Sequence, residues 1–139
     1  MKIRPKSYGP LNLISEQAGA LTFCTEGGYT GIGSRTPGPE GVAPSDLLLA
    51  SLGSCILISA RMAAEAMGLN LGDVNASVRA DKALDLPHRF SRITVEVSGA
   101  AIANWSIDQL EEWKRRTKSL CTVSNTLSAE VCLMVTGDC

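Results

Sequence analysis

A long apolar segment between residues 45 and 67 most strongly constrains how this chain can fold. Leucine and alanine occupy nearly every helical face before Arg61, and Gly68 is a natural helix stop. Serines and Gly53 interrupt the run, which is shorter than the about 20 apolar residues that span a bilayer. The segment therefore predicts a buried core helix and no membrane partner. One thin sheet covers only one face of such a helix, so we expect a second copy of the chain, in a homodimer, to cover the rest.

Short strand patterns precede this helix. Strand-like segments at residues 2–4, 11–14 and 21–24 are separated by glycines and Pro10, which predicts a small antiparallel sheet. A loop rich in proline and glycine follows at residues 33–44, and such loops often carry functional side chains.

Alternating apolar residues predict further strands over residues 73–80 and 93–97, and a closing strand over 131–135. Ser106 and Gln109 form a capping box for a second helix. The apolar stripe of this helix consists of Ile107, Leu110, Trp113, Thr117 and Leu120, and its opposite face pairs Glu111 and Glu112 with Arg115 and Arg116. The pattern predicts a single α+β domain over residues 1–139.

Charge and composition exclude several classes of function. The net charge is −1, from 13 basic and 14 acidic residues, and gives no electrostatic reason to expect nucleic acid or an anionic membrane as a partner. The first residues carry positive charge but no apolar core follows them, so we expect a cytoplasmic protein whose five cysteines stay free. His88 is the only histidine and lacks a partner motif, so no metal site is expected.

Two cysteines stand out by their surroundings. Cys55 lies within the long apolar helix, and Cys121 lies near the end of the second helix. Neither belongs to a Cys-x-x-Cys pair, which disfavours a zinc ribbon or a thioredoxin-type motif. Two separated thiols suit a pair in which one attacks a peroxide and the other closes a disulfide on it. Burial as inert core cysteines is the alternative for both. Cys24 and Cys132 are interpreted as packing residues, and Cys139 as incidental.

The segments around both cysteines resemble the OsmC/Ohr family of thiol-dependent hydroperoxide reductases. Pro-x-acidic-Leu-Leu-Leu-Ala-x-Leu-Gly-x-Cys ends at Cys55, and Cys-x-Val-Ser-Asn-x-Leu begins at Cys121. The resemblance implies two antiparallel sheets around two central helices in an intertwined homodimer. It also implies reduction of organic hydroperoxides, with Cys55 attacking and Cys121 resolving, without a metal or organic cofactor. An external thiol or dithiol, such as a lipoylated protein, would supply the electrons.

The resemblance further implies an acidic residue and an arginine at the site. Asp46 matches the acidic position, and Glu40 is a second candidate. Nine residues of regular helix place Asp46 and Cys55 on opposite faces, so a plain first-turn acid remains the alternative for Asp46.

The arginine is where the sequence departs from the family. Residues 15–20 contain no arginine, so Arg35 in the loop is the nearest substitute and Arg4 the next. A solvated loop residue is the alternative for Arg35. The missing arginine keeps a second hypothesis open, a non-catalytic small-molecule-binding or thiol redox-sensing protein.

Overall fold

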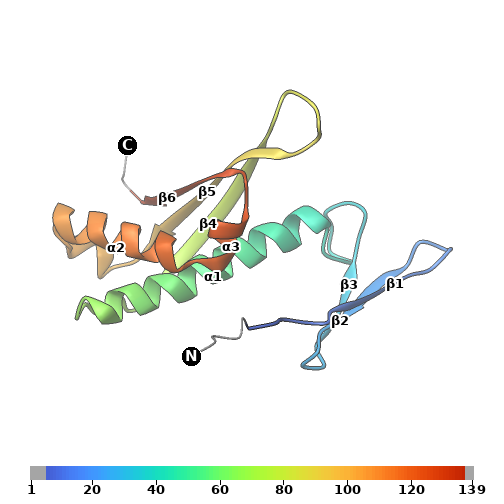
Figure 1. Cartoon of the computed structure of the whole chain (residues 1–139), viewed down its shortest axis with the longest axis horizontal. Helices are drawn as coiled ribbons and strands as arrows, with labels where there is room; N and C mark the ends of the chain where they lie inside the picture. Colours follow the sequence, from blue (N-terminus) through green and yellow to red (C-terminus); the bar gives the residue numbers. More distant parts are fainter. Residues whose placement is uncertain (1–5, 137–139) are drawn as a thin grey trace, which may run out of the picture. The chain divides into compact units, whose positions relative to one another are not determined.

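The computed structural model describes residues 6–136, which form two compact units (Figure 1). The first unit ends at Leu47 and the second begins at Leu48, so the boundary falls in the first turns of the long helix. The strand expected over residues 2–4, the arginine candidate Arg4 and Cys139 lie outside the described residues.

The first unit is a three-stranded antiparallel sheet in the order β1-β2-β3. Its strands are β1 (Asn12–Ser15), β2 (Leu21–Cys24) and β3 (Thr30–Gly33). The strands expected over residues 11–14 and 21–24 are confirmed. Strand β3 was not expected as a separate strand, because two of its four residues are glycines.

The glycines of β3 are explained by the side chains opposite them. Gly31 pairs with Phe23, and Gly33 pairs with Leu21. A Cβ atom on Gly31 would collide with the Phe23 ring, and one on Gly33 would lie 2.7 Å from a methyl carbon of Leu21. The larger side chains of β2 fill the space above the glycines, an arrangement that offsets the weakness of glycine in strands.

The long apolar segment forms helix α1 (Pro44–Ala66), as expected. Proline suits the first helical position because its missing N–H has no partner there. The helix ends in a Schellman motif: the N–H of Leu69 donates to the carbonyl of Ala64 at 2.8 Å, and that of Gly68 donates to Glu65 at 3.0 Å. Gly68 has a φ of +68°, a conformation that favours glycine.

The second unit contains another three-stranded sheet, in the order β4-β5-β6. Its strands are β4 (Asn75–Lys82), β5 (Phe90–Ser98) and β6 (Glu130–Val135). The first two form an antiparallel hairpin, whereas β6 runs parallel to β5. The α+β fold with two three-stranded sheets is thus confirmed, but this sheet is mixed rather than antiparallel. The physical reason is the helical crossover between β5 and β6, which returns the chain in the same direction.

Helices form this crossover: the short 3₁₀ helix η1 (Ile102–Asn104), α2 (Ile107–Leu120) and α3 (Thr122–Thr126). The capping box that starts α2 is confirmed, with Ser106 and Gln109 exchanging hydrogen bonds of 3.0 and 3.1 Å. Glu112 pairs with both Arg115 and Arg116, whereas Glu111 pairs with Lys114, one residue nearer than expected.

The core of the second unit lies between one face of its sheet and helices α1 and α2 (Figure 1). The sheet contributes alternate residues such as Val95 and Leu133, and α1 contributes Leu52 and Ile56. Cross-strand ion pairs mark the opposite face of the sheet: Arg79 with Glu96, and Arg92 with Glu130.

The apolar stripe of α2 is buried only in its middle. Trp113 and Thr117 are fully buried, whereas Ile107 and Leu120, at the two ends of the helix, are 78% and 45% exposed. Only the middle turns of α2 therefore bring the stripe into the core. The Thr117 hydroxyl is buried without a hydrogen-bond partner among the described residues.

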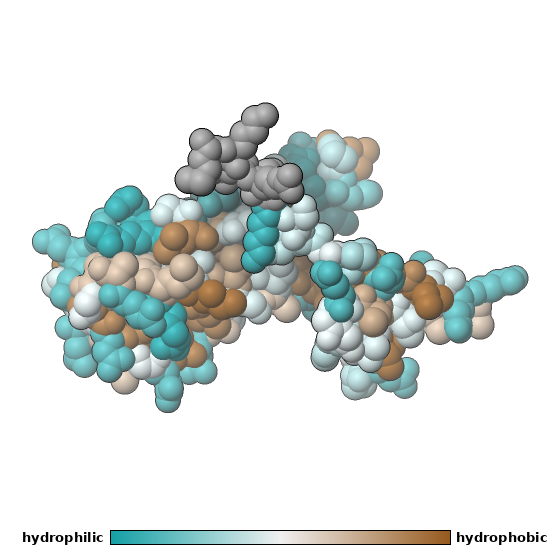
Figure 2. Space-filling view, turned by 60° about the horizontal axis from the view of Figure 1, so that its bottom comes forward, coloured by the Kyte–Doolittle hydropathy of each residue, from teal (hydrophilic) through white to brown (hydrophobic). Residues whose placement is uncertain are grey.

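One side of α1 remains exposed within the second unit. The helix is long and apolar enough to span a membrane by length and composition, but Leu52, Ile56 and Ala60 are buried in the core of this unit. Ile58 and Met62 are 64% and 52% exposed and line an open groove of about 350 Å³. Figure 2 shows brown, apolar surface on the helical side of this unit.

Candidate functional site

The structure brings two of the sequence-predicted site residues together, Cys55 of α1 and Cys121. Cys55 is partly exposed, whereas Cys121 is fully buried, and both thiols are free. The thiol of Cys121 and the sulfur of Cys55 are hydrogen-bonded to each other. Residues 66 positions apart in sequence thus meet at one point of the second unit.

Cys121 occupies the junction between two helices. It is the C-cap of α2 and also the N-cap of α3, with an extended backbone. Its sulfur accepts a 3.3 Å hydrogen bond from the N–H of Ser124, and Asn125 donates its side-chain amide to the carbonyl of Ser119 at 3.0 Å. Cys121 itself is thus the residue that caps α3.

The electrostatic surroundings of Cys55 favour its thiolate. Burial raises the pKa of the Cys55 thiol, but four hydrogen bonds together outweigh this effect and bring the pKa below its usual value. The backbone N–H groups of Val123 and Thr122 donate two of them. The Cys121 thiol and the Ser59 hydroxyl provide the others. Hydrogen bonds to the charged form of a group stabilise that form.

The surroundings of Cys121 have the opposite effect. Burial, together with the hydrogen bond to Cys55 and the negative charge of its thiolate, raises the pKa of Cys121 to about 11. Hydrogen bonds from the N–H groups of Ser124 and Val123 act in the other direction but are outweighed. Cys121 therefore keeps its proton at neutral pH, whereas Cys55 loses its proton more readily than an ordinary cysteine does.

Sequence reasoning missed part of this arrangement. Ser59 lies one helical turn after Cys55 and is 3% exposed, so its i+4 spacing was a visible signal. The N–H groups of Thr122 and Val123 gave no signal, because any residue type supplies a backbone N–H. Their position depends on α3, and a helix of five residues is too short to show a periodic pattern in the sequence.

The acidic and basic candidates belong to the first unit. Arg35 and Glu40 are exposed in the loop before α1. The carboxylate of Asp46 accepts a 3.4 Å hydrogen bond from the N–H of Ala43, which is half of a capping box. This contact matches the first-turn alternative for Asp46, and the roles expected for these three residues stay predictions.

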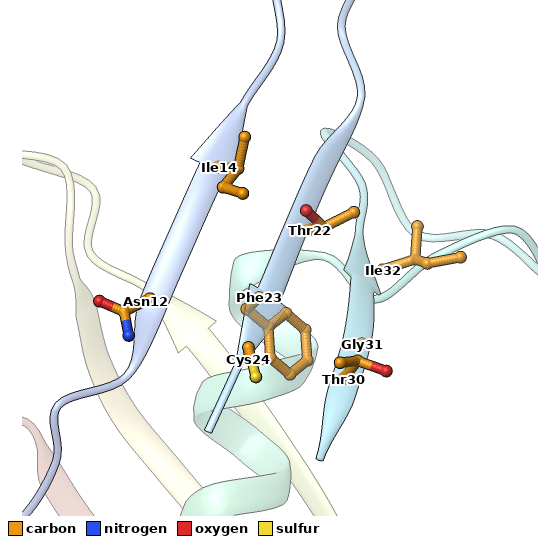
Figure 3. A pocket seen from close by; sticks show the side chains of 8 residues that line it. All are labelled: Asn12, Ile14, Thr22, Phe23, Cys24, Thr30, Gly31 and Ile32. Atoms are coloured by element: carbon orange, nitrogen blue, oxygen red, sulfur yellow. The ribbon is translucent and has the colours of Figure 1, made fainter. Parts of the chain in front are cut away.

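Other candidate sites lack comparable chemistry. No group of three metal-ligating side chains occurs among residues 6–136, and His88 is exposed. An open depression of about 480 Å³ lies on one face of the first sheet, where Cys24 lies among aliphatic and threonine side chains (Figure 3). Its lining includes no charged side chain and neither of the two paired cysteines. We therefore place the candidate site at Cys55 and Cys121.

Comparison with solved structures shows the same fold in several bacterial proteins. An OsmC-like protein from Mycoplasma pneumoniae superposes with a TM-score of 0.82 at 17% identity, covering 96% of this chain and 98% of that one. An OsmC-like protein of unknown function from Vibrio cholerae gives 0.78 at 15% identity, covering 94% and 99%. The organic hydroperoxide resistance protein OhrB of Bacillus subtilis gives 0.72 at 14% identity, covering 94% and 98%.

Comparison with curated proteins found no match. The family model described as OsmC-like protein matches residues 37–135, which include Cys55 and Cys121, helices α1, α2 and α3, and the second sheet. This match covers well over half of the chain and agrees with the structural comparisons. The chain belongs to the OsmC-like protein family.

Proposed function

We propose that the protein is a thiol-dependent peroxidase that reduces organic hydroperoxides through Cys55 and Cys121. The observation that carries this proposal is the hydrogen-bonded pair, in which the accessible thiol has a lowered pKa and the buried one a raised pKa. The thiolate is the nucleophilic form of cysteine, and a neighbouring thiol traps the sulfenic acid before it oxidises further. Structural similarity to an organic hydroperoxide resistance protein supports the same reaction class.

The proposed reaction proceeds in two steps. The Cys55 thiolate attacks one oxygen of the hydroperoxide, the O–O bond breaks, and Cys55 becomes a sulfenic acid while an alkoxide departs as the alcohol. Cys121 then attacks the Cys55 sulfur, forming a disulfide and releasing the oxygen as water. An external thiol or dithiol returns two electrons and restores both thiols. No metal or organic cofactor takes part.

Arg35, Asp46 and Glu40 have supporting roles in this proposal. Arg35 supplies positive charge that favours the thiolate, and Asp46 orients it, with Glu40 as the second acidic candidate. The hydrogen bonds around Cys55 already lower its pKa, so the charge of Arg35 adds to an effect that the second unit produces by itself.

We further propose that the protein works as a homodimer in the cytoplasm. The exposed apolar residues Ile58 and Met62 support the dimer, because a second copy of the chain would remove them from water. Free thiols suit a reducing compartment, where a cellular dithiol can recycle the disulfide.

Turnover with a dithiol tests the proposal. Purified protein with dihydrolipoamide should consume many equivalents of cumene hydroperoxide, and fewer of hydrogen peroxide. Cys55→Ser should abolish consumption, whereas Cys132→Ser, which changes another partly exposed cysteine, should retain it. If the protein consumes one equivalent and is not recycled, the redox-sensing alternative is correct instead.

A further inference from the structure

We propose that Cys121 also acts as the general acid of the first step, giving its proton to the departing alkoxide before it attacks Cys55. This inference rests on the peroxidase reaction proposed above and adds a catalytic task to the resolving residue. One proton transfer would then complete the reduction of the hydroperoxide and generate the nucleophile for disulfide formation.

The geometry places the proton at the reacting sulfur. Cys121 donates its S–H to the sulfur of Cys55, which attacks the hydroperoxide oxygen from which the alkoxide departs. The N–H of Ser124 approaches the Cys121 sulfur at 3.3 Å and engages it as an acceptor. Cys121 is fully buried, so water does not reach its proton, and the reacting centre at Cys55 is the direct acceptor.

Acidity favours the transfer. With its pKa raised to about 11, Cys121 keeps its proton at neutral pH until a stronger base is formed. An alkoxide is such a base, since its conjugate alcohol is about as weak an acid as water. The Ser59 hydroxyl is the other side chain that donates to Cys55, but an alcohol gains nothing by protonating an alkoxide.

Oxidation of Cys55 then favours the Cys121 thiolate. The hydrogen bond to Cys55 and the negative charge on Cys55 both raise the pKa of Cys121. Both contributions disappear when Cys55 becomes a neutral sulfenic acid. The N–H groups of Ser124 and Val123 remain and stabilise the new thiolate. The resolving thiol is thus held inactive until its target exists.

The atoms and electrons balance over the two steps. Cys55 thiolate, hydroperoxide and Cys121 thiol give Cys55 sulfenic acid, alcohol and Cys121 thiolate. In the second step the Cys121 thiolate attacks the Cys55 sulfur, the S–O bond breaks, and hydroxide leaves as the disulfide forms. The hydroperoxide gains the two electrons that the two sulfurs lose, and no further reagent is needed.

A comparison of two peroxides in a single turnover isolates the proton transfer. Reduction of an alkyl hydroperoxide expels an alkoxide, which needs a proton, whereas reduction of a peroxycarboxylic acid expels a carboxylate, which does not. Both reactions use the same Cys55 thiolate. A Cys121 substitution also changes the fraction of Cys55 that is ionised. This change affects both rates equally, so the ratio of the two rates does not depend on it.

The variants are Cys121→Ala and Cys121→Ser, with Ser59→Ala as the matched control that removes a different hydrogen bond to Cys55. Loss of tert-butyl hydroperoxide and of peracetic acid is followed at one equivalent of reduced protein, and the background from Cys55→Ser is subtracted. We expect the ratio of rates to fall about 100-fold in Cys121→Ala, the lower end of general acid catalysis. It should fall less in Cys121→Ser and stay unchanged in Ser59→Ala.

The outcomes separate this inference from the proposed function. An unchanged ratio in both Cys121 variants overturns the inference and leaves the peroxidase intact, provided that the wild type turns over. An equal fall in Ser59→Ala also overturns it, because any lost hydrogen bond would then have the same effect. If wild-type Cys55 does not react with the alkyl hydroperoxide, the proposed function fails first and the inference fails with it.

Discussion

The indole N–H of Trp113 donates a 2.9 Å hydrogen bond to the backbone carbonyl of Ala60, which ties α2 to the middle of α1. Trp113 is fully buried, and the Trp105 ring meets it edge to face with 5.5 Å between ring centroids. This contact lies one helical turn beyond Cys55 and two turns before Cys121, so it supports the spacing of the helices that carry the two thiols.

The first prediction concerns this contact. Trp113→Phe should lower the free energy of unfolding by about 2–4 kcal/mol, because it removes a buried hydrogen bond and leaves a cavity. Denaturant titration measures the change. Ile107→Ala, at an exposed position of the same helix, is the control and should change stability by less than about 0.5 kcal/mol. An effect of equal size in both variants would contradict the anchoring role.

The second prediction concerns the pH dependence of Cys55. Its alkylation by iodoacetamide should rise with pH through a midpoint below that of a free thiol, because hydrogen bonds lower its pKa. Ser59→Ala removes one donor and should move this midpoint upward by about half a unit to one unit. Ser51→Ala, an exposed serine one turn before Cys55, is the control and should not move it.

The third prediction concerns Arg35. If its charge stabilises the thiolate, Arg35→Ala should raise the midpoint of Cys55 alkylation by roughly one to two units. The effect should therefore be large at pH 7 and small at pH 10. Asp46→Asn should act in the same direction but more weakly. An unchanged pH profile in Arg35→Ala would show that hydrogen bonds alone activate Cys55.

The fourth prediction concerns the fate of oxidised Cys55. Treatment with cumene hydroperoxide should form a disulfide between Cys55 and Cys121, identified by peptide mapping with mass spectrometry. In Cys121→Ser, Cys55 should proceed to sulfinic or sulfonic acid, because no thiol traps the sulfenic acid. Earlier oxidation of the exposed Cys24 would show that Cys55 is not the preferred nucleophile.

The fifth prediction concerns oligomeric state. Light scattering at low micromolar concentration should give twice the chain mass of 14.7 kDa. Ile58→Glu places a charge in the exposed apolar part of α1 and should shift the protein toward the monomer. Leu84→Glu, at a fully exposed loop position, is the matched control and should remain dimeric. A folded wild-type monomer would rule out the dimer.

Periodicity and capping rules predicted the parts of the fold that depend on residues close together in the sequence. The bounds of α1 and the capping box at Ser106 depend on neighbouring residues along the chain, and both are confirmed. The parallel pairing of β6 was not predicted, because alternation reports which face a residue occupies but not the direction of the neighbouring strand.

The candidate site was also predictable only in part. Spacing and family resemblance identified Cys55 and Cys121, whereas their contact depends on how α1 and the crossover pack together. The backbone N–H donors of Thr122 and Val123 could not be predicted from the sequence, because every residue type except proline supplies a backbone N–H. Ser59 was visible in the sequence but had no distinguishing feature until its hydrogen bond to Cys55 was known.

The contact between Cys55 and Cys121 also joins two distant points of one chain. A disulfide there would enclose β4, β5 and α2 within a single covalent loop. Closing a loop of this length restricts the unfolded chain, with a contribution on the order of 4 kcal/mol to the stability of the folded state. The oxidised protein should then melt at a higher temperature than the reduced one. The melting temperature would thus report the redox state of the molecule, and each reduction of the disulfide would return it to a less stable form.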